Sequence, residues 1–177
     1  MQHLSAEELL AQYANGTRDF SQINLIRANL FEVNLSDVNL YQSNLQEVYL
    51  PYADLSNANL CQAQFQAAEL SDANLNQTNL SQANLGNANL CRASLRYANL
   101  KGADLSGANL QGADLYHADL SDANLKYADL TGAYLEAAKL DGAQLTGTNF
   151  YRAKKVNLSE ANCDRTTVFP DGFCRDS

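Results

Sequence analysis

The stretch Ala98-Asn99-Leu100-Lys101-Gly102 is one copy of a five-residue repeat that decides the fold. From Phe20 to Phe150 an apolar residue recurs at every fifth position, 27 times in all, as 24 leucines and three phenylalanines. A small residue, most often alanine, stands two positions before most of them, and larger residues such as Ile23, Val33 and Val48 stand there in the first coils. Asparagine or aspartate fills the position between in 20 of the 27 repeats. One periodic pattern therefore organises most of the 177 residues.

A period of five fits neither an α-helix nor a single straight strand. On a helix, at about 100° per residue, successive leucines drift by about 140° around the axis. On a strand, neighbouring side chains alternate between faces, so an odd period sends successive leucines to opposite sides. The leucines share one interior only if the chain turns once per repeat. We therefore predict an all-β solenoid in which each coil contacts only its neighbours.

Segments such as Ala103-Asp104-Leu105-Ser106-Gly107 and Ala108-Asn109-Leu110-Gln111-Gly112 resemble the A(D/N)LXX signature of pentapeptide repeat proteins, and the resemblance covers nearly the whole chain. It implies a right-handed quadrilateral β-helix with four pentapeptides per coil. Counting three repeats of an irregular last coil, about 7.5 coils then form a rod about 36 Å long. Many similar proteins are cyanobacterial, and we expect a cytoplasmic bacterial protein.

Each position in the repeat has a physical role. Leucine fills the interior, and alanine points inward near a corner, where a larger side chain would crowd the turn. Glycines such as Gly102 take the second turn position, where a type II turn needs positive φ, and Pro51 takes the first. Asparagines that are 20 residues apart stack on one face and are expected to form an amide ladder: Asn39, Asn59, Asn79 and Asn99.

We predict three parts within one domain: a capping helix in 1–16, the repeat β-helix in 17–152, and a register-shifted last coil with a C-terminal cap in 153–177. In the first part, residues 4–15 form an amphipathic helix, with Ser5 as N-cap and Glu8 completing a capping box. A lid over the open first coil is the expected use of this helix. Binding of a partner is the alternative.

The pattern changes after Phe150. Lys154 and Lys155 cannot both point into an apolar core, so residues 153–155 are predicted to form a bulge. The next inward candidates are Leu158, Cys163 and Val168, preceded two residues earlier by Val156, Ala161 and Thr166. Phe169, Pro170 and Phe173 then either cover the last coil or build an end-to-end homodimer.

The four cysteines do not indicate a metal site. Cys61 and Cys91 differ by one and a half coils, so they lie on opposite faces and cannot pair. Cys163 and Cys174 both belong to the terminal cap, where a disulfide can form, although a cytoplasm favours the reduced pair. The chain has no C-x-x-C motif and no zinc-like spacing.

Nothing in the sequence predicts an enzyme or a cofactor. His3 lies in a terminus that we expect to be mobile, and His117 lies in an outward turn without an evident Ser or Cys partner. The glycines recur as turn residues and form no phosphate loop. A net charge of −8 argues against direct nucleic-acid binding. No apolar run is long enough to span a membrane.

Folding the sequence into 20-residue coils predicts one unusual corner. Aromatic and ionisable side chains gather there, and such residues are enriched at protein interfaces. The alternative is that turn positions accept almost any residue and that Tyr suits a β-surface. The candidate residues are Arg96, Tyr97, Tyr116, His117, Tyr134 and Glu136.

The sequence favours a non-catalytic scaffold that binds an unknown protein partner. The alternative is inhibition or protection of DNA gyrase or topoisomerase by DNA mimicry, which the resemblance brings in through acidic quinolone-resistance proteins of the same family. Mimicry needs a dense anionic surface, and here the charge is diluted. Residues 17–91 carry net −5, residues 92–151 net −2 and residues 152–177 net +1.

Overall fold

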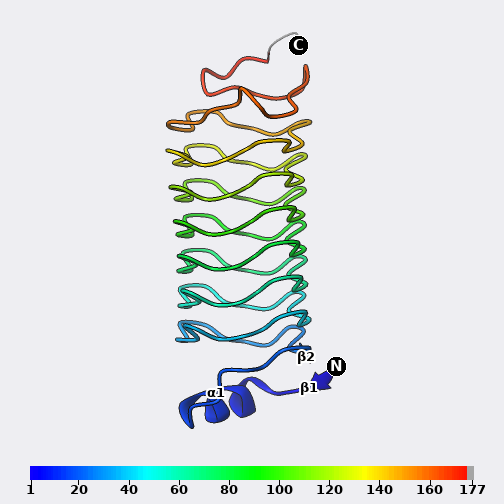
Figure 1. The fold of residues 1–177 in the computed structure, drawn as a ribbon, viewed down its shortest axis with the longest axis vertical. Coiled ribbons are helices and arrows are strands. Elements are labelled where there is room, and N and C mark those ends of the chain that lie inside the picture. The colour runs from blue at the N-terminus through cyan, green and yellow to red at the C-terminus, as the bar shows by residue number, and fades with distance from the viewer. Residues whose placement is uncertain (175–177) are drawn as a thin grey trace.

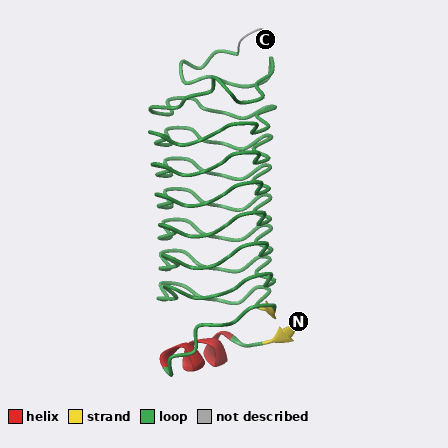
Figure 2. Cartoon of the chain, viewed as in Figure 1, coloured by secondary structure: helices red, strands yellow, loops and turns green. Residues whose placement is uncertain are grey.

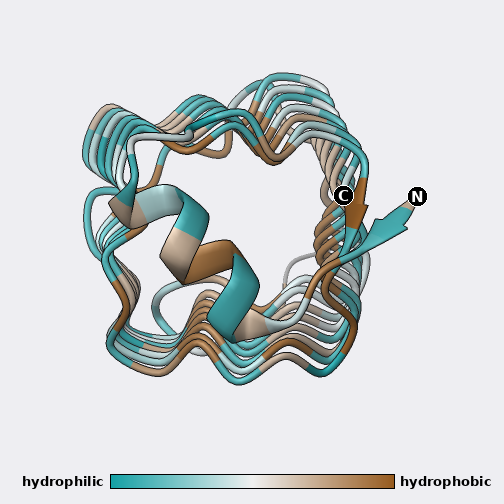
Figure 3. Cartoon of the chain, turned by 90° about the horizontal axis from the view of Figure 1, so that it is seen from below, coloured by the Kyte–Doolittle hydropathy of each residue, from teal (hydrophilic) through white to brown (hydrophobic). Residues whose placement is uncertain are grey.

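The computed structural model is a rod, and it describes residues 1–174 (Figure 1). Its regular elements are few: strand β1 (Gln2–His3), helix α1 (Ala6–Ala14) and strand β2 (Ile23–Asn24). Beyond β2 the chain winds in stacked coils to the other end of the rod, drawn as turns and loops (Figure 2). Seen along the rod, the coils superimpose on a four-sided outline, and α1 lies across the opening (Figure 3).

Parallel bridges between residues 20 apart hold the coils in register. Asn39 pairs with Asn59, Asn59 with Asn79, and Asn79 with Asn99. Four pentapeptides therefore make one coil. Nearly all bridges are isolated single-residue pairs, because a turn in every repeat leaves only one extended position per side. The sheet faces that we expected are thus columns of single bridges rather than continuous strands.

The backbone bonds of one repeat show how the turn is closed. The Ala28 amide donates to the Leu25 carbonyl at 3.0 Å, which spans the two turn residues between them. The Leu25 amide donates to the Asn44 carbonyl of the next coil at 2.8 Å, and the Asn44 amide donates back to Ile23 at 2.8 Å. The repeat therefore satisfies its polar backbone partly within itself and partly through its neighbours.

The asparagine or aspartate of each repeat caps the turn that follows. Ile26, the first turn residue, has no backbone acceptor in this pattern, and its amide donates to Oδ1 of Asn24 at 3.1 Å. Pro51 has no amide hydrogen, so the position two residues earlier needs no cap and holds Tyr49 instead. The preference for Asn and Asp is therefore a backbone requirement, which the sequence analysis did not recognise.

The expected amide ladder forms as well. Nδ2 of Asn59 donates to Oδ1 of Asn39 at 2.9 Å, Asn79 donates to Asn59 at 3.5 Å, and Asn99 donates to Asn79 at 3.3 Å. Each of these side chains thus contacts the coil before it while its Oδ1 also caps the adjacent turn. The column contributes both to the turns and to the stacking of coils.

The core is the apolar ladder. All 27 positions from Phe20 to Phe150 are buried, as expected. The larger residues at the alanine position in the early coils also point inward, and Val38, Ser43 and Val48 are fully covered. The Ser43 hydroxyl donates to the Phe20 carbonyl at 3.0 Å, so its polar atom is satisfied inside the core. The early interior is therefore packed with bulkier side chains beneath the lid.

The second turn position has positive φ, as the glycines predicted. Gly102 has a φ of +65°, but within residues 1–174 the same region is used by 22 non-glycine residues, nearly all at this turn position, including Ala67 at +54°. At position 147 glycine is also favoured by space, because a Cβ there would lie 2.5 Å from the Tyr127 ring. Glycine therefore marks only part of a conformation that the whole rod adopts.

Helix α1 closes the N-terminal end. The Glu8 amide donates to the Ser5 hydroxyl and the Ser5 amide donates to the Glu8 carboxylate, so the predicted capping box is confirmed. Leu9 is fully buried against the first coil. The prediction of a mobile terminus was wrong, because His3 belongs to β1, which pairs in parallel with β2. The N-terminal segment thus adds one short rung beneath the first coil.

The C-terminal end departs from the 20-residue register, as predicted, but its inward-pointing positions differ from the predicted ones. Gln144 bridges to Asn162 and Asn149 to Val168, which are separations of 18 and 19 residues. Val168 therefore occupies a face position, and Thr167, not Thr166, is the buried residue before it. The prediction of Val168 and Thr166 as inward residues was wrong because the turn after Cys163 holds one extra residue. Residues 168–174 fold back over this end through an antiparallel bridge.

Candidate functional site

The structure brings the six predicted corner residues together into one surface cluster, which we call the corner patch (Arg96, Tyr97, Tyr116, His117, Tyr134 and Glu136). Five of them are turn residues of neighbouring coils, and Tyr134 lies on the adjoining face. Backbone hydrogen bonds between neighbouring coils hold these residues in place, as for Tyr97, whose amide donates to the Tyr116 carbonyl at 2.8 Å. The patch is therefore carried on a rigid support.

Ring contacts run through the patch without a break. The rings of Tyr97 and His117 stack with centroids 5.3 Å apart, and those of Tyr116 and Tyr134 stack at 6.3 Å. Tyr116 also meets Tyr97 edge to face at 5.5 Å and His117 at 4.3 Å. The Tyr134 hydroxyl donates to the Glu136 carboxylate. Tyr97 is 53% exposed, so the cluster presents aromatic surface to solvent.

Arg96 fixes one side of the patch. Its guanidinium carbon lies 4.5 Å from the centre of the Tyr116 ring, and its Nη1 donates to Oδ2 of Asp114 at 2.8 Å. Asp114, which lies 18 residues after Arg96, was not predicted as part of this corner. The structure shows that long side chains reach diagonally between coils, as Gln111 also does toward Asp129. A spacing of 18 is the sequence signal that could have identified this partner.

The neighbours of Tyr116 and Arg96 in the patch hold both side chains in their protonated forms. The neighbouring Tyr97 hydroxyl, loss of water and the charge of Glu136 raise the pKa of Tyr116 above its ordinary value. The hydrogen bond to Asp114 likewise raises the pKa of Arg96. Both groups thus keep their protons at neutral pH, and the patch offers donors, ring faces and one guanidinium.

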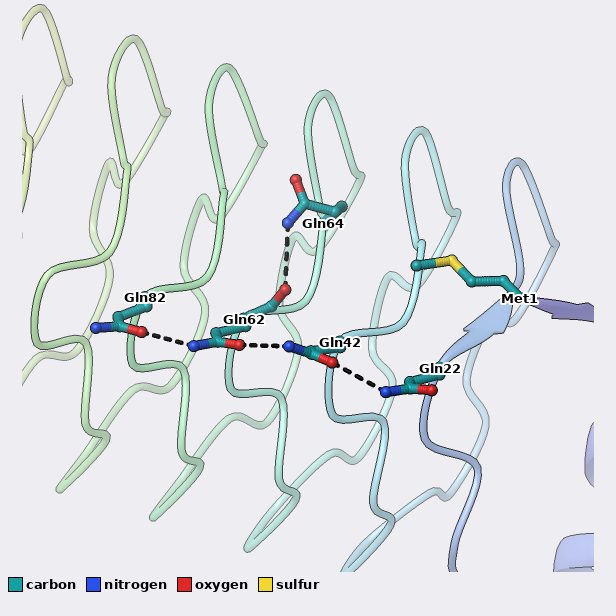
Figure 4. Close-up of a pocket in the computed structure, with 6 residues that line it drawn as sticks. All are labelled: Met1, Gln22, Gln42, Gln62, Gln64 and Gln82. Atoms are coloured by element: carbon teal, nitrogen blue, oxygen red, sulfur yellow. Dashed lines mark hydrogen bonds between the residues drawn. The ribbon is translucent and has the colours of Figure 1, made fainter.

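A second candidate is a groove of about 700 Å³ lined by glutamines and Met1 (Figure 4). Its floor is a row of amides in the second turn position: Gln22 donates to Gln42 at 3.0 Å, Gln42 to Gln62 at 2.7 Å, and Gln62 to Gln82 at 2.7 Å. These amides satisfy one another between coils. We therefore interpret the row as a support for coil stacking, which the 20-residue spacing of the glutamines could have predicted.

The remaining predicted site residues lie at the C-terminal end. All four cysteines are free, and burial, followed by the charge of Asp164, raises the pKa of the Cys163 thiol. The disulfide between Cys163 and Cys174 stays a prediction. Phe169 and Pro170 border a shallow groove of about 320 Å³, and Phe173 is 71% exposed.

Ion pairs interrupt the anionic surface of the rod. Arg27 pairs with Glu47 at 2.8 Å and Arg92 with Asp72 at 2.6 Å, each across neighbouring coils. The pairing hydrogen bonds lower the pKa of both carboxyl groups. Among the residues that the structure describes, no three His, Cys, Asp or Glu side chains gather as a metal site. Within 1–174, no helix is long and apolar enough to cross a membrane.

The repeat pattern matches the family model for pentapeptide repeats in eight copies, which begin at residue 19 and end at residue 162. This chain belongs to the pentapeptide repeat family. Solved relatives of this fold imply that the β-helix is right-handed. The family consists largely of structural and interaction modules, and no catalytic family matches.

Solved structures agree on the fold. QnrB1, a plasmid-mediated fluoroquinolone resistance protein, is 16% identical over 81% of this chain and 78% of its own, with a TM-score of 0.68. A pentapeptide repeat protein from the Arabidopsis thaliana thylakoid lumen is 36% identical over 52% of this chain and 65% of its own, with a TM-score of 0.52.

A cyanobacterial protein resembles the chain over nearly its full length. HetL of Nostoc sp. strain PCC 7120, which is involved in regulating heterocyst differentiation, is 26% identical over 98% of this chain and all of its own, with a TM-score of 0.45. No curated protein matches the chain.

Proposed function

We propose that this pentapeptide repeat protein is a non-catalytic rod that binds a protein partner through its corner patch. The observation that carries the proposal is the unbroken chain of ring contacts from Tyr97 through Tyr116 to Tyr134, with Arg96 over the middle ring. Tyr and Arg dominate the residues whose truncation costs most at protein interfaces. Because each residue is held on a bonded coil, little conformational entropy is lost when a partner binds.

The burial pattern supports a binding use of the corner patch over a structural one. The interior of these coils is filled by the ladder, for example by Leu95, Leu115 and Leu135, and needs nothing from the exposed rings. Turn positions elsewhere in the rod are mostly small or polar, as at Gly102, Ser106 and Gln111. The tyrosines at this corner, of which Tyr97 is exposed and Tyr116 and Tyr134 are half-buried, therefore add little to stacking. They provide the apolar area and hydrogen-bond donors that an interface uses.

DNA mimicry is the weaker reading. The pairs formed by Arg27, Arg92 and Arg96 place positive charge within the acidic surface. A mimic needs regularly spaced and unneutralised acids, and such pairs break the spacing. Inhibition of gyrase supercoiling by the purified protein, lost on charge reversal of Asp54, Asp72 and Asp114, would support mimicry in place of the proposed function.

The test compares two double variants of equal chemistry. Tyr97→Ser with Tyr116→Ser removes the centre of the corner patch, and Tyr127→Ser with Tyr151→Ser removes two exposed rings elsewhere. Partners are captured from an extract of the source organism on the immobilised protein, identified by mass spectrometry, purified and titrated against each form. We expect the patch variant to bind about 30-fold more weakly, because interface tyrosines commonly contribute 2 kcal/mol or more.

The control variant should bind as the unchanged protein does. Both variants should also unfold at the same urea concentration as the unchanged protein, since none of the four rings belongs to the interior. Equal affinity of all three forms for the purified partner would reject the corner patch as the binding surface.

A further inference from the structure

A second aromatic cluster lies in the first coils, well away from the corner patch. Phe31, Tyr49 and Tyr52, which we call the aromatic trio, are 44%, 45% and 56% exposed. The rings of Phe31 and Tyr49 are nearly parallel with centroids 6.1 Å apart, and Tyr52 meets Phe31 edge to face at 6.0 Å. The segment 31–52, which contains the trio, forms light-blue coils near β2 in Figure 1.

The rings of the trio fill none of the interior of the rod, although the Tyr52 hydroxyl hydrogen-bonds to the Asp72 carboxylate of the next coil. Leu30 and Leu50, the ladder residues of these repeats, are buried on the inner side, whereas the three rings lie outside. Phe31 and Tyr52 are turn residues, and Tyr49 stands at a position that usually holds Asn or Asp. An exposed cluster of three rings on a surface of polar turns is the kind of feature that marks an interaction site.

The charge around the trio is negative over a long stretch. Residues 28–91, which span more than three coils, contain six acidic side chains and no Lys, Arg or His. Glu32 follows Phe31 in the chain and lies one coil from Tyr52 in the same turn column. Glu69 is the bridge partner of Tyr49 on the next coil. The three rings therefore sit within an acidic rim that attracts cations and repels anions.

The chain itself shows which group these rings would take. An arginine guanidinium lies over the ring of Tyr13 at 3.8 Å, of Tyr116 at 4.5 Å and of Tyr151 at 4.9 Å. Within residues 1–174, no such contact is made to any ring of the trio. Arg27 and Arg92, which bound the acidic stretch, are already paired with carboxylates of Glu47 and Asp72. The ring faces of the trio are therefore left for a cation from outside.

We propose that the aromatic trio binds an arginine-bearing basic segment of a partner protein. The guanidinium lies against the exposed ring faces, and Glu32 on the rim pairs with the same side chain or its neighbour. Arginine fits better than lysine, because its planar group can stack on a ring while it donates to a carboxylate. The site is distinct from the corner patch, so experiments can reject or support this proposal independently of the proposed function.

The experiment must separate this site from simple attraction to an acidic rod. The probe is a fluorescein-labelled ten-residue peptide of alternating glycine and arginine, titrated by anisotropy with the full chain. A glycine–glutamine peptide of the same length is the neutral reference. Phe31→Ser with Tyr52→Ser leaves the net charge unchanged, and so does the control, Tyr127→Ser with Tyr151→Ser.

We expect the arginine peptide to bind at least tenfold more tightly than the neutral peptide. The trio variant should lose about tenfold in affinity for the arginine peptide, since two ring contacts are removed, while the control should lose less than twofold. Equal affinity of the trio variant and the unchanged protein would overturn the proposal, because net charge alone would then explain binding.

A second pair of variants tests the rim. Glu32→Gln and Asp37→Asn each remove one negative charge from an exposed turn in the first coils, but only Glu32 lies beside the trio. We expect the loss of affinity for the arginine peptide to be at least threefold greater for Glu32→Gln. Equal losses from the two variants would overturn the assigned role of Glu32.

Discussion

The two ends of the rod are closed in different ways. At the N-terminal end, α1 lies across the first coil, with Leu9 fully buried and a complete capping box at Ser5. At the C-terminal end a shortened, register-shifted coil leaves Leu158 and Cys163 only partly covered. A helix can cover the opening with one apolar stripe, whereas an irregular coil must fill it residue by residue.

This contrast between the two caps indicates which end of the rod is less stable. Coils of a solenoid are stabilised mainly by their neighbours, so an end coil has only one neighbour unless a cap replaces the other. The buried cap supplies that second neighbour at the N-terminus. The partly exposed cap at the C-terminus makes less contact with its end coil. We therefore expect local opening to begin at the C-terminal end.

The largest contrast should come from truncating the apolar residue at each end. Leu9→Ala should lower the free energy of unfolding by about 3 kcal/mol, because a fully buried leucine leaves a cavity that the helix cannot close. Leu158→Ala should cost about 1 kcal/mol, since its side chain is partly solvated already. Urea unfolding followed by circular dichroism measures both. Equal losses of unfolding free energy from the two substitutions would contradict the conclusion that the N-terminal end is more firmly closed.

The capping box should account for a smaller part of the N-terminal stability. Ser5→Ala removes the hydroxyl that accepts the Glu8 amide at 3.1 Å and should cost about 1 kcal/mol. Ser5→Asp keeps an acceptor in that place and should restore most of the loss. The same urea titration measures both variants, and an equal loss from alanine and aspartate would show that the lost acceptor for the Glu8 amide is not the cause.

The backbone and core could be predicted from the sequence because one period fixes both. Every ladder position from Phe20 to Phe150 is buried, and the capping box at Ser5 forms as expected. The columns of residues 20 apart also follow from the period, which is why the corner patch could be identified before its contacts were known. These features depend on spacing alone.

The missed features depend on how far side chains reach and on small changes of register. Asp114 lies diagonally from Arg96, and the aromatic trio combines Phe31 and Tyr52 from one corner with Tyr49 from the adjoining face. Column counting does not reveal such pairs. One extra residue near Thr167 likewise shifts the last coil, and only the packing of that coil decides where it is inserted.

Exposed apolar surface should make the C-terminal end the place where two copies meet. Phe173 is 71% exposed beside the groove that Phe169 and Pro170 border. We expect sedimentation equilibrium at high micromolar concentration to show a dimer and Phe173→Ser to give a monomer. The substitution should change the unfolding free energy by less than about 0.5 kcal/mol, since the ring is outside the core. A monomeric unchanged protein would reject this interface.

The smallest effect should appear in acid, at one carboxyl group of the C-terminal coil. Hydrogen bonds from the hydroxyl and amide of Thr166, at 2.6 and 2.8 Å, lower the pKa of Asp164 to about 2 from an ordinary value of 3.8. Because the pKa is lowered in the folded chain, the carboxylate stabilises this coil above about pH 4, and the contribution is lost as pH falls toward 2.

The amide proton of Thr166 reports this ionisation directly by NMR. We expect its shift to titrate with a midpoint near 2 and to lose that titration in Asp164→Asn, which keeps an oxygen acceptor but carries no charge. The matched group near the other end is Asp19, whose pKa is also lowered, first by the Ser21 amide at 3.1 Å. The midpoint for Asp164 should lie below that for Asp19. The reverse order would mean that the Asp164 turn opens in solution, and that the C-terminal coil is even less firmly closed than its burial indicates.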